Sequence, residues 1–399
     1  MGASTFVFSM IWVRQSDDTG GVWFECLPTT APPDTLLGMV QRGRGAGWLA
    51  AVADPVEGRA ALLACLTDDP RWDHQVESRA EFYASLAVAL EVSAADIAAC
   101  GDINDEDHWL VAETLTALSV RGDSNARELL AQRIPDTWFE DLMAEPTLPF
   151  PPLNAPLSAL LGNEHLVSHH DLMHRLRTTT DPDDLAALHE ATRDPNRRGF
   201  RSAMLALAER GDTSFVTQVG DILAGNPVGQ PRAGFLGYLP RLPARDSLPI
   251  ARLWFGLPDS RDDAALQVLA LHATAQDVSA IRARLAVSES TYDQCDLVEA
   301  LGRVPECGPY PELRTVFTDA CYSYLRRESA QALATTDPDF ANTFATECLW
   351  DCEAGTREVG AKYAPATEQV QRRLAELAAD EDEAVRDAAR RRLVGPPAR

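Results

Sequence analysis

The chain lacks most features that mark nucleic-acid-binding proteins. Of its 36 basic residues only Lys362 is a lysine, and the basic runs, "RRGFR" at 197–201 and "RRR" at 390–392, are short. Its 60 aspartates and glutamates give a net charge of −24. Because affinity for DNA or RNA comes largely from neutralising phosphates, the composition disfavours a nucleic-acid ligand, and for the same reason an anionic membrane surface.

Long apolar runs and dense cysteines are also missing. No apolar stretch approaches the roughly 18–20 residues that a membrane-spanning helix needs. The N-terminal "MGASTFVFSMIWVRQ" has no basic segment of the kind that opens a signal peptide. The eight cysteines are scattered along 399 residues, unlike those of a small secreted disulfide-bonded domain. We therefore expect a cytoplasmic protein with reduced thiols.

Catalytic motifs are absent as well. The chain contains no G-x-S-x-G, no H-E-x-x-H and no G-x-G-x-x-G in a strand context. This absence favours a protein that binds rather than catalyses, and we assign no catalytic, cofactor-binding or metal-ligating residue.

What the chain does contain is a helical pattern, clearest at its C-terminus. The segment 374–393, "LAELAADEDEAVRDAARRRL", has two apolar-periodic stretches separated by an acidic turn. In the second stretch Val385, Ala388, Ala389 and Leu393 share one face of a helix with 3.6 residues per turn. Asp380 or Asp382 can accept hydrogen bonds from the first amides of that helix. The segment is predicted to be a helical hairpin.

The second helix of this hairpin has a pattern that recurs. An apolar residue and an arginine are followed by a small residue and then another apolar residue, and the matches end near 176, 208, 239, 271, 301, 333, 364 and 393. A period of about 31 residues indicates stacked hairpins, because one hairpin alone cannot bury its apolar face.

An aspartate in each turn and an arginine early in each second helix accompany the repeat. The pairs are Asp194 and Arg201, Asp319 and Arg326, Asp351 and Arg357, and Asp380 and Arg386. In this feature residues 160–399 resemble the HEAT-repeat family, including the shorter HEAT-like repeats of bacteria. The resemblance implies an all-α fold, a right-handed α-solenoid of stacked hairpins, in which aspartate and arginine form a ladder between successive repeats.

The remaining sequence divides the chain into four parts. Residues 1–30 contain "TFVFSMIWVRQ" and "GVWFECL" around "SDDTGG", which predicts a β-hairpin that caps the solenoid or docks a partner. Residues 31–144 are expected to form irregular helical repeats, with helices within 74–90 and 105–118. Residues 145–157 are rich in proline and form a joint. Residues 158–399 form the HEAT-like repeats.

Four of the eight histidines lie in "GNEHLVSHHDLMHRL", residues 162–176. On a helix, His165 and His169 lie near the apolar face that contains Leu172, Met173 and Leu176, whereas His170 and His174 lie on another face. One tetrahedral zinc ion therefore cannot bind all four. We interpret the stretch as a repeat helix, with a metal or small-ligand sensor using residues 165–174 as an alternative.

Two further stretches resemble ligand-binding loops. "DINDEDHWLVAE" at 102–113 spaces oxygen ligands like a calcium loop, but Asp107 stands where the turn needs glycine, and Asp105 as a helix N-cap explains it better. "RGRGAGW" at 42–48 could offer amides to a phosphate, yet it follows a helical stretch and lacks the rest of a P-loop. We predict that it is a flexible loop.

Two short motifs have structural interpretations. Cys348 and Cys352 of "CLWDC" are expected one turn apart on a helix, as buried thiols that behave like small apolar side chains. "RGD" occurs at 121–123 and 210–212, and because both copies follow similar helical stretches we interpret them as equivalent turns.

The expected function is that of a non-enzymatic scaffold or adaptor. Stacked hairpins form a concave surface suited to a protein or peptide partner, and the net charge of −24 would attract a basic one. Trp254 and Trp350 are either binding hot spots or ordinary packing residues between repeats. The alternatives are a HEAT-like enzyme, of the nucleic-acid base glycosylase or bilin lyase type, and the sensor described above.

Overall fold

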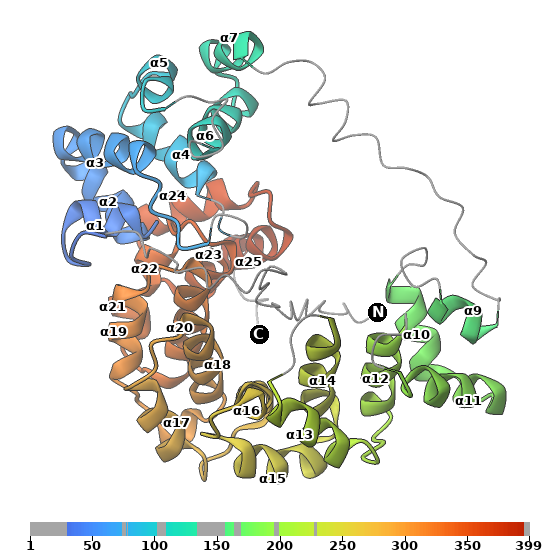
Figure 1. The fold of residues 1–399 in the computed structure, drawn as a ribbon. Helices are drawn as coiled ribbons and strands as arrows, with labels where there is room; N and C mark the ends of the chain where they lie inside the picture. Colours follow the sequence, from blue (N-terminus) through green and yellow to red (C-terminus); the bar gives the residue numbers. More distant parts are fainter. Residues whose placement is uncertain are drawn as a thin grey trace. The chain divides into compact units, whose positions relative to one another are not determined.

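The computed structural model describes residues 30–73, 77, 79–101, 109–133, 156–162, 169–194, 199–226 and 230–394. Within these ranges every regular element is a helix and none is a strand, so the all-α prediction is confirmed for this part of the chain (Figure 1). The predicted β-hairpin and nearly all of the proline-rich joint lie outside the described residues.

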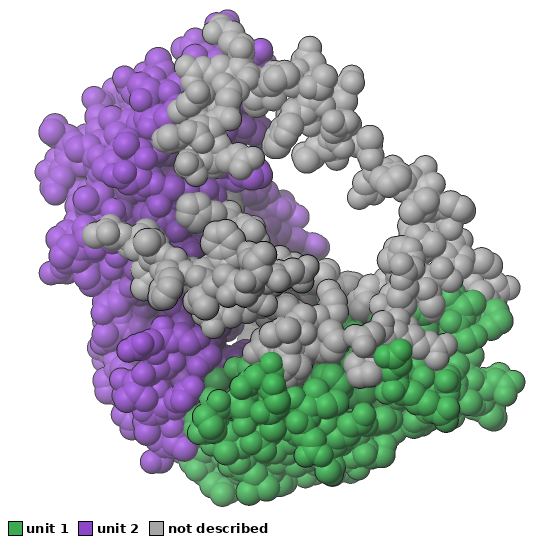
Figure 2. Space-filling view, viewed as in Figure 1, with its two compact units in different colours: residues 1–25, 146–277 green, residues 26–145, 278–399 purple. Residues whose placement is uncertain are grey.

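The chain forms two compact units, and each comprises two separate stretches of the sequence. Unit 1 comprises residues 1–25 and 146–277, and unit 2 comprises residues 26–145 and 278–399 (Figure 2). Helices near the start of the sequence therefore share a unit with helices near its end. The repeat region expected at 158–399 contributes to both units.

In the described part of unit 1, each even-numbered helix from α10 onward packs on the next even-numbered helix. Helix α10 packs on α12, α12 on α14, and α14 on α16. Aromatic side chains such as Phe200, Phe235 and Tyr238 fill the core between them. The helices are α9 (Leu157–Gly162), α10 (His169–Thr178), α11 (Pro182–Ala191), α12 (Phe200–Glu209), α13 (Val216–Ala224), α14 (Gln230–Arg241), α15 (Ala244–Trp254) and α16 (Ser260–His272).

The C-terminal part of unit 2 repeats this arrangement, with α18 packed on α20, α20 on α23, and α23 on α25. Its elements are α17 (Val278–Leu285), α18 (Thr291–Gly302), the 3₁₀ turn η3 (Pro305–Cys307), α19 (Glu312–Asp319), α20 (Ser323–Thr336), α21 (Phe340–Thr343), α22 (Ala345–Cys348), α23 (Ala354–Tyr363), α24 (Glu368–Leu377) and α25 (Glu383–Val394).

The helices predicted from the 31-residue period lie where the pattern placed them. The eight second helices, α10, α12, α14, α16, α18, α20, α23 and α25, begin at residues 169, 200, 230, 260, 291, 323, 354 and 383, so each begins 29 to 32 residues after the one before. Seven of the predicted end positions lie inside these helices, and Ala364 directly follows α23. The predicted helix spacing is confirmed.

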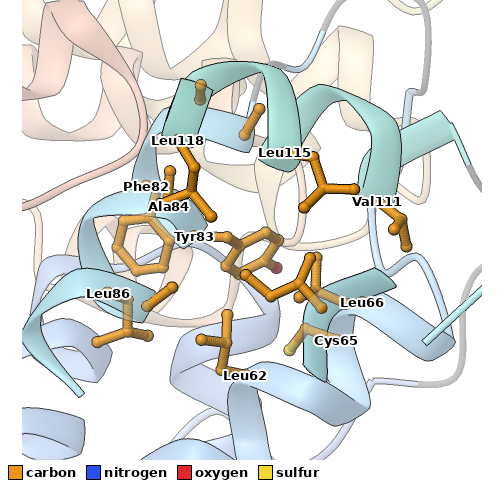
Figure 3. Packing of buried hydrophobic residues seen from close by; sticks show 14 of the residues in the cluster. Leu62, Cys65, Leu66, Phe82, Tyr83, Ala84, Leu86, Val111, Leu115 and Leu118 are labelled. Atoms are coloured by element: carbon orange, nitrogen blue, oxygen red, sulfur yellow. The ribbon is translucent and has the colours of Figure 1, made fainter. Parts of the chain in front are cut away.

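The N-terminal part of unit 2 is a separate cluster of helices. These are α1 (Leu36–Gln41), α2 (Gly45–Ala53), α3 (Pro55–Thr67), α4 (Ala80–Ala89), α5 (Ala94–Ala98), α6 (Trp109–Val120) and α7 (Ser124–Arg133). Figure 3 shows their core, in which the buried Tyr83 ring lies among Leu62, Leu66 and Leu115. Helices were predicted within 74–90 and 105–118, and α4 and α6 confirm them.

Polar side chains fix where many helices begin. Thr35, Asp54, Ser93, Ser290 and Thr367 each precede a helix and accept a hydrogen bond from an amide in its first turn. Such caps satisfy amides that have no partner inside the helix, and each stabilises by about 1 kcal/mol.

The two RGD stretches form equivalent helix ends. Gly122 and Gly211 have φ of 100° and 77°, the left-handed conformation that favours glycine. The amide of Asp123 donates to the carbonyl of Leu118, and that of Asp212 to the carbonyl of Leu207, both at 3.0 Å. Their interpretation as equivalent turns is confirmed.

Candidate functional site: an acidic and aromatic surface in unit 2

Arginine–aspartate pairs connect successive hairpins of unit 2. Arg326 Nε donates to Asp351 Oδ2 at 2.7 Å, and its Nη2 to Oδ1 at 3.0 Å. One repeat later, Arg357 donates to both carboxylate oxygens of Asp380 at 3.2 Å. Arg357 Nη1 also donates to the backbone carbonyl of Cys352, at 2.8 Å. The aspartate and arginine positions identified in the sequence therefore do meet between neighbouring hairpins at these two steps.

The segment "RGRGAGW" is buried against these repeats, so its prediction as a flexible loop is wrong. Helix α2 begins at Gly45, and Arg42 and Arg44 are only 5% and 6% exposed. Arg44 Nη2 lies 3.0 Å from both carboxylate oxygens of Glu347, and Arg42 Nε donates to the carbonyl of Asp319 at 3.0 Å.

The glycines of this segment allow that close approach. A Cβ on Gly45 would lie 1.8 Å from the carbonyl oxygen of Glu347, and a Cβ on Gly43 would lie 2.5 Å from Cys352 Sγ. Gly43 also has a φ of 67°. Only glycine allows the backbones to come this close. From the sequence alone, the same glycines suggest a flexible segment.

Two glutamates cap helices that belong to the opposite end of the sequence. Glu347 Oε2 accepts a hydrogen bond at 3.1 Å from the amide of Ala46, in the first turn of α2. Glu77 Oε1 accepts one at 2.8 Å from the amide of Ser323, where α20 begins. A carboxylate at a helix N-terminus satisfies free amides and meets the positive end of the helix dipole. We call this set of contacts the junction.

The buried charges of the junction compensate one another. Glu77 Oε1 lies 2.9 Å from Arg79 Nη2, and both side chains are fully buried. Burial alone would raise the pKa of Glu77, but the Arg79 guanidinium and the amide donors hold that pKa below its usual value. Arg79 also donates to the carbonyl of Cys321 at 2.7 Å.

The "CLWDC" cysteines lie next to the junction. Helix α22 ends at Cys348 and Cys352 lies in the following turn, so the prediction that one helix contains both is wrong. Cys348 is fully buried, as expected of a small apolar side chain. Burial raises the pKa of the Cys352 thiol to about 12, although Arg326 lies 3.2 Å away.

Both tryptophans proposed as hot spots are packing residues. Trp350 is buried and stacks on Trp48 with ring centroids 5.7 Å apart. Trp254 is half-buried in the core of unit 1, and its ring lies so close to Gly220 that a Cβ there would be 2.9 Å away. Between the two interpretations, packing is the one confirmed.

The described part of the histidine-rich stretch from residue 169 onward lies in helix α10, which begins at His169. Leu172, Met173 and Leu176 are buried and His174 is exposed. His165 lies outside the described residues, as do residues 102–108 of the calcium-like stretch. Among the residues that the structure describes, no three histidines, cysteines, aspartates or glutamates are grouped to hold a metal ion.

Four aromatic rings gather where the N-terminal helices meet α18 and α20. Trp72 lies between α3 and α4, and its ring centroid is 5.0 Å from that of Tyr292 and 4.8 Å from that of Tyr322. Tyr322 and Tyr324, at the start of α20, stack at 5.5 Å. Tyr292 is 39% exposed and Tyr322 is buried, so the cluster has one accessible edge.

Carboxylates from three successive hairpins interact electrostatically with Arg327, whose guanidinium packs on the Tyr324 ring. They are Glu299 of α18, Glu328 of α20 and Glu353, which caps α23. Burial, and then the negative charge of Glu328, raises the pKa of Glu299, although Arg303 opposes it with Nη2 2.7 Å from Glu299 Oε1. Burial likewise raises the pKa of Glu353, although Arg327 opposes it. A raised carboxyl pKa means that the local surroundings do not fully compensate the negative charge.

An arginine already occupies part of this region. Arg327 lies with its guanidinium carbon 4.4 Å from the centroid of the Tyr324 ring, and its Nη2 is 2.6 Å from Glu328 Oε1. Stacking on an aromatic ring combined with pairing to a carboxylate is a favourable environment for a guanidinium. We call the following set the acidic–aromatic surface: Trp72, Asp73, Tyr292, Glu299, Tyr322, Tyr324, Arg327, Glu328 and Glu353.

Sequence reasoning missed this surface. The one available signal was the repeat register, in which Tyr292 and Tyr324 each stand second in their helix. Nothing in the local pattern around Trp72 or Asp73 indicates that they meet α18 and α20, because more than 200 residues separate them from Tyr292, whose hydroxyl lies 3.3 Å from Asp73 Oδ2.

The charge of the chain is concentrated in the unit that contains this surface. Residues 26–145 and 278–399 hold 23 of the 36 basic and 42 of the 60 acidic residues, which amounts to −19 of the net −24.

Comparisons with protein-family models, with curated proteins and with solved structures gave no match for this chain. None of the described helices has the length and apolar character needed to cross a bilayer.

Proposed function

We propose that the protein is a non-enzymatic HEAT-like scaffold that binds a basic segment of a partner protein on the acidic–aromatic surface. The observation that carries the proposal is the group formed by Glu299, Glu328 and Glu353 around Arg327, which packs on the Tyr324 ring. These residues come from three successive hairpins, so an extended segment could contact them in order.

The repeat architecture supports the proposal. Hairpins of regular spacing whose second helices pack on one another are typical of right-handed α-solenoids, which use the surface of the second helices for binding.

Charge and chemistry together define the partner. A unit with a formal charge of −19 attracts cationic segments over distance, which speeds encounter more than it adds affinity. Specific affinity would come from the aromatic edge and the carboxylates. The Arg327 environment is a model for how a partner arginine would bind, with one face on a tyrosine and its donors on a glutamate.

The test is a titration of a fluorescein-labelled nona-arginine peptide, followed by fluorescence anisotropy at physiological salt. The triple variant Glu299→Gln, Glu328→Gln and Glu353→Gln removes three negative charges from the surface and should weaken binding about tenfold, which corresponds to about 1.4 kcal/mol.

A matched control separates site from net charge. The variant Glu289→Gln, Glu306→Gln and Glu368→Gln removes the same charge from exposed positions of unit 2. It should bind nearly as tightly as the unmodified protein. Equal weakening by the two triple variants, or no binding to the unmodified protein, would refute the proposal.

A further inference from the structure

We infer that docking of the N-terminal helices on the C-terminal repeats completes the acidic–aromatic surface, so that this docking and the binding of a basic partner are energetically coupled. The inference rests on the proposed function and adds to it that the site is composite. One part comes from α18, α20 and α23, and the other from Trp72 and Asp73.

Glu77 connects the two parts through its two carboxylate oxygens. Oε2 accepts hydrogen bonds from the amides of Trp72 and Asp73, at 2.7 and 3.0 Å. Oε1 accepts from the amide of Ser323 at 2.8 Å. One buried carboxylate thus holds the backbone that presents Trp72 and Asp73 and, at the same time, the first residue of α20.

The junction holds the same N-terminal helices to the next hairpin. Arg44 pairs with Glu347, and the amide of Cys352 donates to the carbonyl of Gly43 at 3.0 Å. Because these groups are buried, separating the two segments would leave charged and polar groups without their native partners. Trp72 and Asp73 therefore form part of the acidic–aromatic surface only when the N-terminal helices are docked.

Coupling follows from this arrangement. A partner that contacts Trp72 and Asp73 together with the repeat carboxylates binds the docked state more tightly than the undocked state, so it stabilises docking. By reciprocity, the factor by which the partner favours the docked state is also the factor by which docking strengthens partner binding. A change that weakens docking therefore weakens partner binding only as far as it lowers the docked fraction.

The primary measurement is amide hydrogen exchange of the unmodified full chain, with and without saturating nona-arginine. Coupling predicts slower exchange at the first amides of α2, such as that of Ala46, which belongs to the junction and not to the surface. Binding of the peptide without any change at these amides would overturn the inference. No binding at all would refute the proposed function instead.

The reciprocal measurement uses Glu347→Gln, which alters the junction and leaves the surface residues in place. Without peptide, exchange at the start of α2 should become faster, and saturating peptide should slow it by at least about fivefold, the low end of typical coupling factors. Glu306→Gln, at an exposed position of the same unit, should change neither quantity. Faster exchange in Glu347→Gln that saturating peptide does not slow would show that docking and binding are independent.

Discussion

Units 1 and 2 are built from hairpins of the same spacing, yet they connect those hairpins differently. In unit 2 the pair Arg326–Asp351 is almost fully buried. In unit 1 Glu209 bridges Arg177 of α10 and Arg241 of α14 near the surface, where the arginine side chains are 48% and 30% exposed. Buried pairs require both partners, whereas exposed pairs contribute little. The same sequence period therefore supports connections of very different strength.

The two units also differ in net charge, and in unit 2 the N-terminal helices pack over some of the turns between repeat helices. Unit 2 has a formal charge of −19 and unit 1 only −5. In unit 2 the N-terminal helices cover the turns around Asp319 and Glu347, and the same helices supply Trp72 to the candidate surface. The unit that contains the buried pair is thus also the one that contains the proposed surface.

The largest expected effect comes from breaking a buried pair. Asp351→Ala leaves the Arg326 guanidinium buried without its carboxylate, which should destabilise unit 2 by about 3–5 kcal/mol. Glu209→Ala in unit 1 should cost less than about 1 kcal/mol for each exposed pair it removes. Urea unfolding of both variants measures the difference. Equal losses would mean that the two units are connected in the same way.

A smaller effect is expected from adding one methyl group at the junction. In Gly45→Ala the new Cβ would clash with the carbonyl oxygen of Glu347, and overpacking of this kind costs about 1–3 kcal/mol. The comparison in unit 1 is Gly225→Ala, where the nearest atom would be 3.3 Å away and the residue is exposed. Thermal unfolding should show a clear loss for the first variant and almost none for the second. A harmless Gly45→Ala would contradict the close packing of α2 on α22.

The smallest expected effect is a pH dependence of peptide binding. Because Glu299 and Glu353 have raised pKa values, they lose their charge at a higher pH than an ordinary glutamate as the solution is acidified. A cationic peptide needs these charges. As the pH is lowered, its affinity should therefore begin to fall at a pH above 4.5, the ordinary pKa of a glutamate. Anisotropy titrations between pH 7 and pH 5 test this.

Glu299→Gln with Glu353→Gln is the matched variant for that titration. It should bind more weakly at pH 7 and show a flatter profile over the same interval, because glutamine does not titrate. A profile as steep as that of the unmodified protein would assign the pH dependence to other groups.

Much of the fold could be predicted because helix positions depend on local sequence patterns. The spacing of apolar residues located all eight second helices, and Gly122 and Gly211 identified two equivalent turns. The errors have a common cause. Gly43 and Gly45 were interpreted as flexible, and Cys348 and Cys352 as members of one helix, because the residues that pack against them lie far away in the sequence.

The sequence by itself determined which segments are helical and how often the hairpin recurs, since helix periodicity and capping depend on residues three or four positions apart. It also determined the excess of negative charge. Only the tertiary structure decided that the helices before residue 134 join those after residue 277 in one unit, where Arg44 meets Glu347 across 303 residues. Such a distant pair produces no periodic pattern in the sequence. Its energy comes from burial and charge compensation, which exist only once both segments have folded together.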